Sequence, residues 1–139
     1  MYGGIGEDYA RSYREEDIKE TVSKVTGIPK EELGVVQGYS DWGPDFYVYH
    51  KGKLVAIVEV KTTILSDRYP GYSEGCLHDA KEELRKYFTR GEWREHFGNV
   101  EYGVGVAIYL RDLDKIIETE FKEGVEYTID IIRNPNYGP

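Results

Sequence analysis

Hydrophobic and polar residues follow two different periods along the chain, and these periods mark out the expected helices and strands. From Ser12 to Gly27, apolar residues recur every three or four positions, which predicts an amphipathic helix. A short strand is expected over 34–39, followed by a turn over 40–44. The first part of the chain should therefore add one helix and one strand to the fold. The apolar stripe of the helix consists of Ile18, Val22 and Val25.

The middle of the chain carries two strand-like runs, at 46–50 and 53–63, which are close enough in sequence to pair as a hairpin. A second amphipathic helix is expected over 77–88. A buried strand rich in β-branched residues should follow over 102–110. The apolar side of the second helix consists of Ala80, Leu84, Tyr87 and Phe88.

The end of the chain adds a third helix, expected over 112–121, and a closing strand over 126–132. The element order is α-β-β-β-α-β and then α-β. Helices and strands that alternate around a central hairpin predict an α/β sandwich with a mixed sheet.

The chain has 139 residues, the size of one ordinary domain. We expect a single domain over 1–139, in which residues 1–11 form a flexible segment and 12–110 form the core. Residues 111–139 should supply the additional helix and strand. No apolar run reaches the roughly 18 residues of a membrane span, and the start lacks a secretory signal. The single cysteine fits a reducing compartment. We therefore expect a soluble, cytoplasmic protein that does not bind membranes.

Candidate chemistry concentrates between Asp45 and Lys61. Asp45 opens the first strand of the hairpin, while Glu59 and Lys61 end the second. Because strand side chains alternate between the two faces of a sheet, Glu59 and Lys61 share one face. Whether Asp45 joins them depends on the loop between the two strands.

Two loops are compatible with the sequence of the hairpin. A two-residue loop at 51–52 would place Asp45 opposite Val58, on the wrong face. A three-residue loop at 50–52, with its glycine in the left-handed conformation, would place Asp45 opposite Ile57 and on the same face as the other two residues. We expect the three-residue loop, because it also gathers an entirely apolar set on the other face. That set is Phe46, Val48, Leu54, Ala56, Val58 and Val60.

Two carboxylates at neighbouring strand positions form an oxygen-only site that suits Mg²⁺ or Mn²⁺. We expect Asp45 and Glu59 to bind the metal, with the backbone carbonyl of Val60 as a third ligand. Such a metal lowers the pKa of a bound water and offsets the charge on a pentavalent phosphate, as phosphodiester hydrolysis requires. The Lys61 ammonium would hold the attacking water or a phosphate oxygen.

The pattern made by Pro44-Asp45 and Glu59-Val60-Lys61 resembles the PD-(D/E)xK, or restriction-endonuclease-like, nuclease superfamily. The element order over 12–110 is similar to that of the family, and the spacing up to 102–110 is similar to the amino-terminal nuclease domains of type I restriction enzymes. The resemblance implies a restriction-endonuclease-like αβββαβ core with a mixed central sheet flanked by helices. It also implies Mg²⁺-dependent cleavage of DNA in preference to RNA.

Two glutamates bear on how far the resemblance extends. Many family members use a Glu from the first helix as an additional metal-site residue, and Glu15 is the candidate in this chain. Glu15 can equally be the capping-box partner of Ser12, which stabilises a helix start and needs no metal. The related type I domains often carry Gln where this chain has Glu83, four residues before Tyr87, so the role of Glu83 is open.

The net charge of -8 argues against a protein that handles nucleic acid, although metal-site carboxylates count as negative until the cation is bound. A catalytically inactive module that binds nucleic acid or a protein partner is therefore the alternative, and a homodimer is left open. The acidic balance disfavours a junction-resolving nuclease. Lys81 and Arg85 are interleaved with glutamates, which is typical of a solvated helix face. Trp42, three residues before Asp45, is a candidate for stacking on bases.

Overall fold

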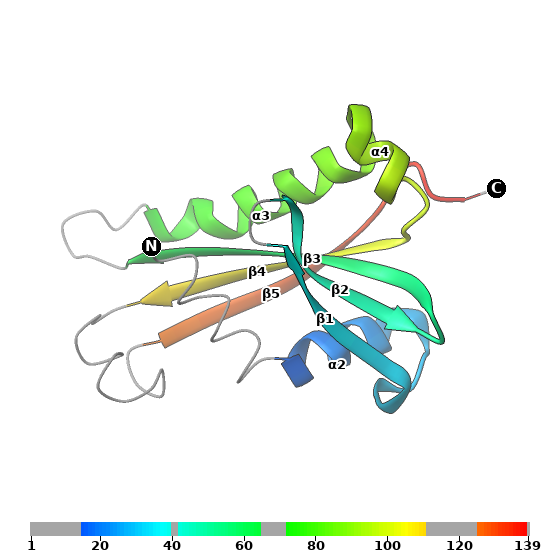
Figure 1. Ribbon diagram of the computed structural model, residues 1–139. Helices are drawn as coiled ribbons and strands as arrows, with labels where there is room; N and C mark the ends of the chain where they lie inside the picture. Colours follow the sequence, from blue (N-terminus) through cyan, green and yellow to red (C-terminus); the bar gives the residue numbers. More distant parts are fainter. Residues whose placement is uncertain (1–14, 40–41, 65–71, 111–124, 139) are drawn as a thin grey trace.

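The computed structural model describes residues 15–39, 42–64, 72–110 and 125–138 (Figure 1). In chain order, its elements are α2 (Glu15–Thr26), a 3-10 turn η1 (Lys30–Glu32), β1 (Leu33–Tyr39), β2 (Trp42–His50), β3 (Lys53–Ile64), α3 (Tyr72–Thr89), α4 (Gly91–Phe97), β4 (Tyr102–Leu110) and β5 (Val125–Arg133). None of the described helices has the length and apolar content that a membrane span would need.

The strands form one five-stranded sheet in the order β1-β2-β3-β4-β5. β3 and β4 run parallel, whereas the other neighbouring pairs are antiparallel. A parallel pair needs a long crossover, and α3 and α4 supply it. These two helices cover one face of the sheet and α2 covers the other (Figure 1). The expected α/β fold, with a mixed sheet flanked by helices, is confirmed.

Most of the expected elements are present, and some have other bounds. β2 begins at Trp42, so residues 42–44 of the turn expected over 40–44 belong to the strand. The strand expected over 102–110 coincides with β4, and the closing strand is β5. α3 begins at Tyr72, five residues before the expected start, and the short helix α4 was not predicted. The third helix expected over 112–121, like Ser12 and the segment 1–11, lies outside the described residues.

The core on the α2 face comes from alternate residues of the strands. Ile18 and Val22 of α2 are buried, as the helical stripe predicts, but the third stripe residue, Val25, is 41% exposed. The two helical residues pack against buried strand side chains, which include Phe46 and Val58. The burial of these side chains fixes which residues of β2 and β3 point to the opposite face. The strand residues buried in this cluster are Leu33, Phe46, Val48, Ala56, Val58, Val60, Val104, Val106 and Ile108.

The second core lies between the sheet and the pair of helices α3 and α4. All four residues of the expected apolar side of α3 are buried. α3 passes close to β4 at Gly103, where a Cβ atom would lie 3.1 Å from a Leu84 methyl and 3.2 Å from the Phe88 ring. A side chain at Gly103 would therefore require Leu84 and Phe88 to shift by a few tenths of an ångström in a closely packed core. The buried residues of this cluster are Ile57, Leu84, Tyr87, Phe88, Phe97 and Val100.

The hairpin between β2 and β3 differs from the expected one. The three-residue loop is wrong: His50 pairs with Lys53, which leaves a two-residue loop. Lys51 and Gly52 both have positive φ, 49° and 78°, as the tightest hairpin turns require. Gly52 adopts this conformation without strain because it has no Cβ.

A bulge then changes the register. Tyr49 pairs with Leu54, but Val48 pairs with Ala56, so that β3 contains one extra residue between the two pairs. The extra residue turns Leu54 to the α3 face, where it packs against the second core, so its expected place among the α2-face residues is wrong. The same shift keeps the rest of the expected apolar set on the α2 face. It also returns Asp45 to the face of Glu59.

Candidate active site

The structure brings the side chains of Asp45, Glu59 and Lys61 together on the α3 face of the sheet. Asp45 Oδ2 accepts a hydrogen bond from the backbone N–H of Val60 at 2.7 Å. Lys61 Nζ lies 3.5 Å from Glu59 Oε2, and the two side chains are 35% and 8% exposed. The site therefore consists of a buried carboxylate, a half-buried aspartate and an amine that reaches solvent.

The end of the β2–β3 ladder positions these groups. The last pair is Phe46 with Val58, so Asp45 and Glu59 are the next residues on either strand. Beyond that pair the Asp45 carboxylate, rather than a backbone carbonyl, accepts the Val60 N–H. The N–H and C=O groups of one strand residue point to the same side, so the Val60 carbonyl also faces towards β2. This is the carbonyl that the sequence suggested as a third metal ligand.

Glu59 is held in an environment that disfavours its charge. Burial raises the pKa of the Glu59 carboxyl, and the charge of Glu83 on α3 acts in the same direction. The ammonium of Lys61 and the hydrogen-bonding contact with Asp45 lower that pKa and oppose the effect of burial. The site thus contains more negative charge than Lys61 alone balances.

The donor set fits a hard divalent cation. Glu59 Oε1 is buried and accepts no hydrogen bond from any residue that the structure describes. A buried polar atom without a partner is costly, and a cation would satisfy it. Over the described ranges, no three His, Cys, Asp or Glu side chains are grouped to hold one ion. Mg²⁺ does not need three, because proteins commonly bind it through one or two carboxylates, waters and substrate phosphates.

Glu15, the helix residue suggested by the family resemblance, is placed apart from this group. It lies at the start of α2, and α2 packs on the face of the sheet opposite Glu59. Its carboxylate is 3.5 Å from Lys19 Nζ, one turn along the same helix. The structure thus pairs Glu15 with Lys19 instead of bringing it to Asp45, and a metal-site role for Glu15 stays a prediction.

An ion pair on the same face lies two strands beyond Glu59. Glu59 is paired with Gly105 on β4, and Gly105 with Asp130 on β5, so the two acidic residues belong to one row across the sheet. Lys81 of α3 binds Asp130, and this hydrogen bond lowers the pKa of the Asp130 carboxyl. Lys81 therefore points to the sheet, which corrects its expected place on a solvated helix face. Arg85 pairs with Glu82 as such a face predicts.

An aromatic cluster borders the acidic site, and we did not predict it from the sequence. Trp93 of α4 lies 5.1 Å from Trp42 and 5.0 Å from Tyr87, measured between ring centroids. Burial raises the pKa of the Tyr87 hydroxyl, and the charges of Glu59, Glu83 and Asp45 raise it further. Tyr87 also packs in the same buried cluster as Ile57, which lies two residues before Glu59 on β3, so the aromatic cluster lies beside the carboxylates. The cluster consists of Trp42, Tyr47, Tyr87, Trp93, His96 and Phe97.

The cluster had a signal in the sequence. Trp93, His96 and Phe97 recur at helical spacing in a segment that we did not assign to a helix. Gly43 on β2 has a φ of 75°, which favours glycine, and a Cβ atom there would lie 3.2 Å from the Tyr47 hydroxyl of the cluster.

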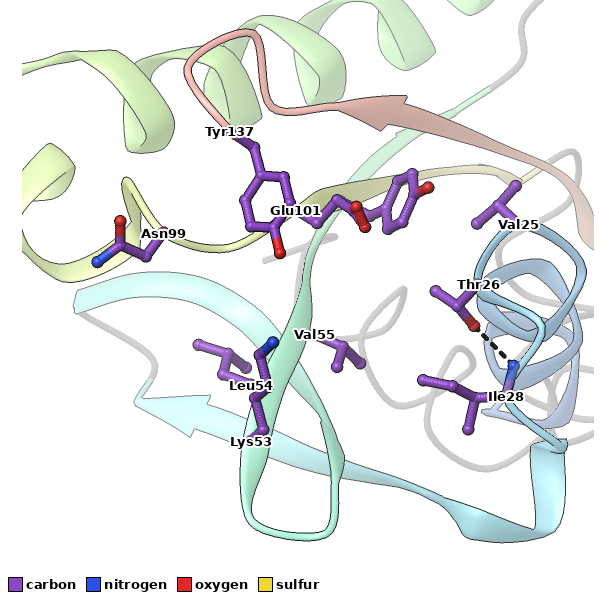
Figure 2. A pocket seen from close by; sticks show the side chains of 10 residues that line it. Val25, Thr26, Ile28, Lys53, Leu54, Val55, Asn99, Glu101 and Tyr137 are labelled. Carbon is purple, nitrogen blue, oxygen red and sulfur yellow. Dashed lines mark hydrogen bonds between the residues drawn. The ribbon is translucent and has the colours of Figure 1, made fainter. Parts of the chain in front are cut away.

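A shallow groove of about 440 Å³ lies where the second half of α3 meets the start of α4. A separate, smaller cavity of about 210 Å³ lies between the end of α2 and the start of β3 (Figure 2). In it, Ile28 N donates a hydrogen bond to Thr26 Oγ1 at 3.2 Å. Its nearest β3 residue, Val55, is four positions from Glu59, or roughly 13 Å along the strand. The groove shares Trp93 with the aromatic cluster, whereas this cavity lies away from the candidate site. The groove is lined by Glu83, Lys86, Arg90, Gly91, Glu92 and Trp93.

A scan against protein-family models, a search of curated proteins and a search of solved structures each found no match to this chain.

Proposed function

We propose that this protein is a metal-dependent nuclease that hydrolyses phosphodiester bonds, with Mg²⁺ or Mn²⁺ as its cofactor and DNA preferred over RNA. One observation carries the proposal: Asp45 and Glu59 lie side by side with Lys61 on one face, and a buried Glu59 oxygen has no hydrogen-bond partner among the described residues. Carboxylates, a backbone carbonyl and an ammonium are the groups that this chemistry uses.

Each residue of the site has a separate part in the proposed reaction. Asp45, Glu59 and the Val60 carbonyl would hold the ion. When bound, the ion would supply an activated water and offset the charge that gathers on the phosphate. Lys61 Nζ reaches solvent beside Glu59, so it can donate hydrogen bonds to the attacking water or to a phosphate oxygen. The N–H of Val60 fixes the orientation of the Asp45 carboxylate.

The test is a cleavage assay with labelled single-stranded, double-stranded and branched DNA and with RNA, each with Mg²⁺, with Mn²⁺ and with a chelator. We expect cleavage only in the presence of metal. Lys61→Ala should reduce it by about 10²- to 10³-fold, the usual cost of losing one preorganised donor. Lys51→Ala is the matched control, because Lys51 lies in the loop of the same hairpin with a 77% exposed side chain.

Three outcomes decide the matter. Loss of cleavage in the chelator and in Lys61→Ala, with Lys51→Ala unaffected, supports the nuclease. Metal-independent cleavage would point to a contaminant. If no substrate is cut while one of them is still bound, the protein is instead a catalytically inactive module that binds nucleic acid.

A further inference from the structure

Trp42 is a large aromatic side chain held at the surface. It is 41% exposed, at the start of β2. Trp93 and His96 of α4 support its ring at 5.1 Å each, the histidine edge-on. A ring that is fixed from behind and open in front loses little conformational entropy when a flat ligand stacks on it.

This exposed ring is continuous with the acidic site. Trp93 contacts both Trp42 and Tyr87, and Tyr87 packs in one buried cluster with Ile57, two residues before Glu59 on β3. Trp42 also precedes Asp45 by three residues on one strand, which is roughly 10 Å. A ligand on the Trp42 ring would therefore lie within a short distance of any phosphate at the carboxylates.

The groove along α3 brings cations to the same place. Lys86 and Arg90 line it together with Glu83 and Trp93. Glu92 also lines the groove, so its charges balance and the electrostatic attraction to phosphate is modest. An aromatic ring flanked by basic side chains is the arrangement by which proteins hold unpaired nucleotides.

We propose that Trp42 and Trp93 form a stacking platform for an unpaired base of the nucleic acid strand that is cut at Asp45 and Glu59. Lys86 and Arg90 contact the phosphates of the same strand. The inference rests on the proposed nuclease function and specifies its substrate class. Bases inside a duplex are stacked on each other and offer no free face. The substrate is therefore single-stranded nucleic acid, or a duplex with an unpaired end, and not an intact blunt duplex.

The two tryptophans make this proposal directly measurable. The chain contains two Trp, and both belong to the aromatic cluster, so intrinsic tryptophan fluorescence reports on this surface alone. With a chelator present to prevent cleavage, titration with a ten-nucleotide oligothymidylate should quench the fluorescence of the wild-type protein. A blunt duplex of equal charge should quench it far less.

Affinity for a labelled oligothymidylate, followed by anisotropy, assigns the effect to Trp42. Trp42→Ala should weaken binding by roughly 10- to 100-fold, whereas Trp42→Phe should restore most of it. Tyr137→Ala is the control, since Tyr137 lines the separate cavity of Figure 2. Thermal midpoints of all three variants show that each is folded.

The results separate this inference from the nuclease itself. Equal affinity of Trp42→Ala and wild type, or equal quenching by the blunt duplex, would overturn the platform, and cleavage could still be present. Trp42-dependent binding without cleavage of any substrate would support the platform and contradict the hydrolysis.

Discussion

Glu59→Gln is expected to reduce metal-dependent cleavage by more than about 10²-fold. The amide keeps the size of the side chain but removes the negative charge, and a divalent ion depends on that charge. The assay is initial cleavage rate in Mg²⁺ and in Mn²⁺, on whichever substrate the wild type cuts fastest. Glu31→Gln is the matched control, because Glu31 is an exposed residue of η1, outside the candidate site. Full activity in Glu59→Gln, or an equal loss in Glu31→Gln, would contradict the assignment.

The same substitution should leave the metal-free protein as stable as the wild type or make it more stable. Burial raises the pKa of Glu59 from its ordinary value of 4.5. Between pH 4.5 and the raised pKa of the folded protein, the folded chain binds more protons at this residue than the unfolded chain. The contribution of Glu59 to the free energy of unfolding therefore falls as the pH rises through this window, and it stays low above it. Gln carries no such penalty.

Thermal midpoints of wild type and Glu59→Gln, measured in chelator across this pH range, test the sign of the effect. The difference in favour of Gln should grow as the pH rises from 4.5 through the folded pKa of Glu59 and then level off. A difference that does not change with pH, or a lower midpoint for Gln at neutral pH, would show that the Glu59 carboxylate is not destabilised by burial.

Phe46→Ala should have the largest effect on stability, about 3–5 kcal/mol in the free energy of unfolding. Phe46 is 1% exposed and is the residue next to Asp45, with its ring in the α2-face core. A cavity at that position removes packing that the rest of the core cannot fully replace. The loss is a large share of the roughly 5–15 kcal/mol that a domain has, and urea denaturation measures it.

Val36→Ala is the control for this change, because Val36 is an apolar strand residue that is 52% exposed. Its effect should stay within about 0.5 kcal/mol. Equal losses of stability in the two variants would contradict the burial of the Phe46 ring in the α2-face core.

The fold was predictable where it depends on local pattern. The helical period of Ile18 and Val22 and the β-branched run of 102–110 each identified an element correctly. The hairpin shows where such reasoning ends. The sequence favoured a three-residue loop, whereas a two-residue loop followed by a bulge produces the observed register. The two solutions place Asp45 on the same face, because the observed register beyond the bulge differs from the expected one by two residues, and a shift of two leaves every side chain on the same face.

The candidate site likewise has a part that the sequence predicted and a part that it did not. Asp45, Glu59 and Lys61 lie on one hairpin, so the sequence was sufficient to bring them together. Trp42 and Trp93 meet across the sheet and α4, and the position of that helix depends on packing between segments that are distant in the chain. Single-sequence patterns contain no information of that kind.

Calorimetric titration of the metal-free protein with Mn²⁺ tests most directly whether Asp45 and Glu59 hold a divalent ion. Asp45→Asn is the variant to compare, since its side-chain carbonyl can still accept the Val60 N–H and so preserve the strand end. Saturable binding in the wild type that is lost in Asp45→Asn is the predicted result. If the wild type shows no saturable heat of Mn²⁺ binding, or if Asp45→Asn gives the same isotherm, the metal site and with it the proposed nuclease are contradicted.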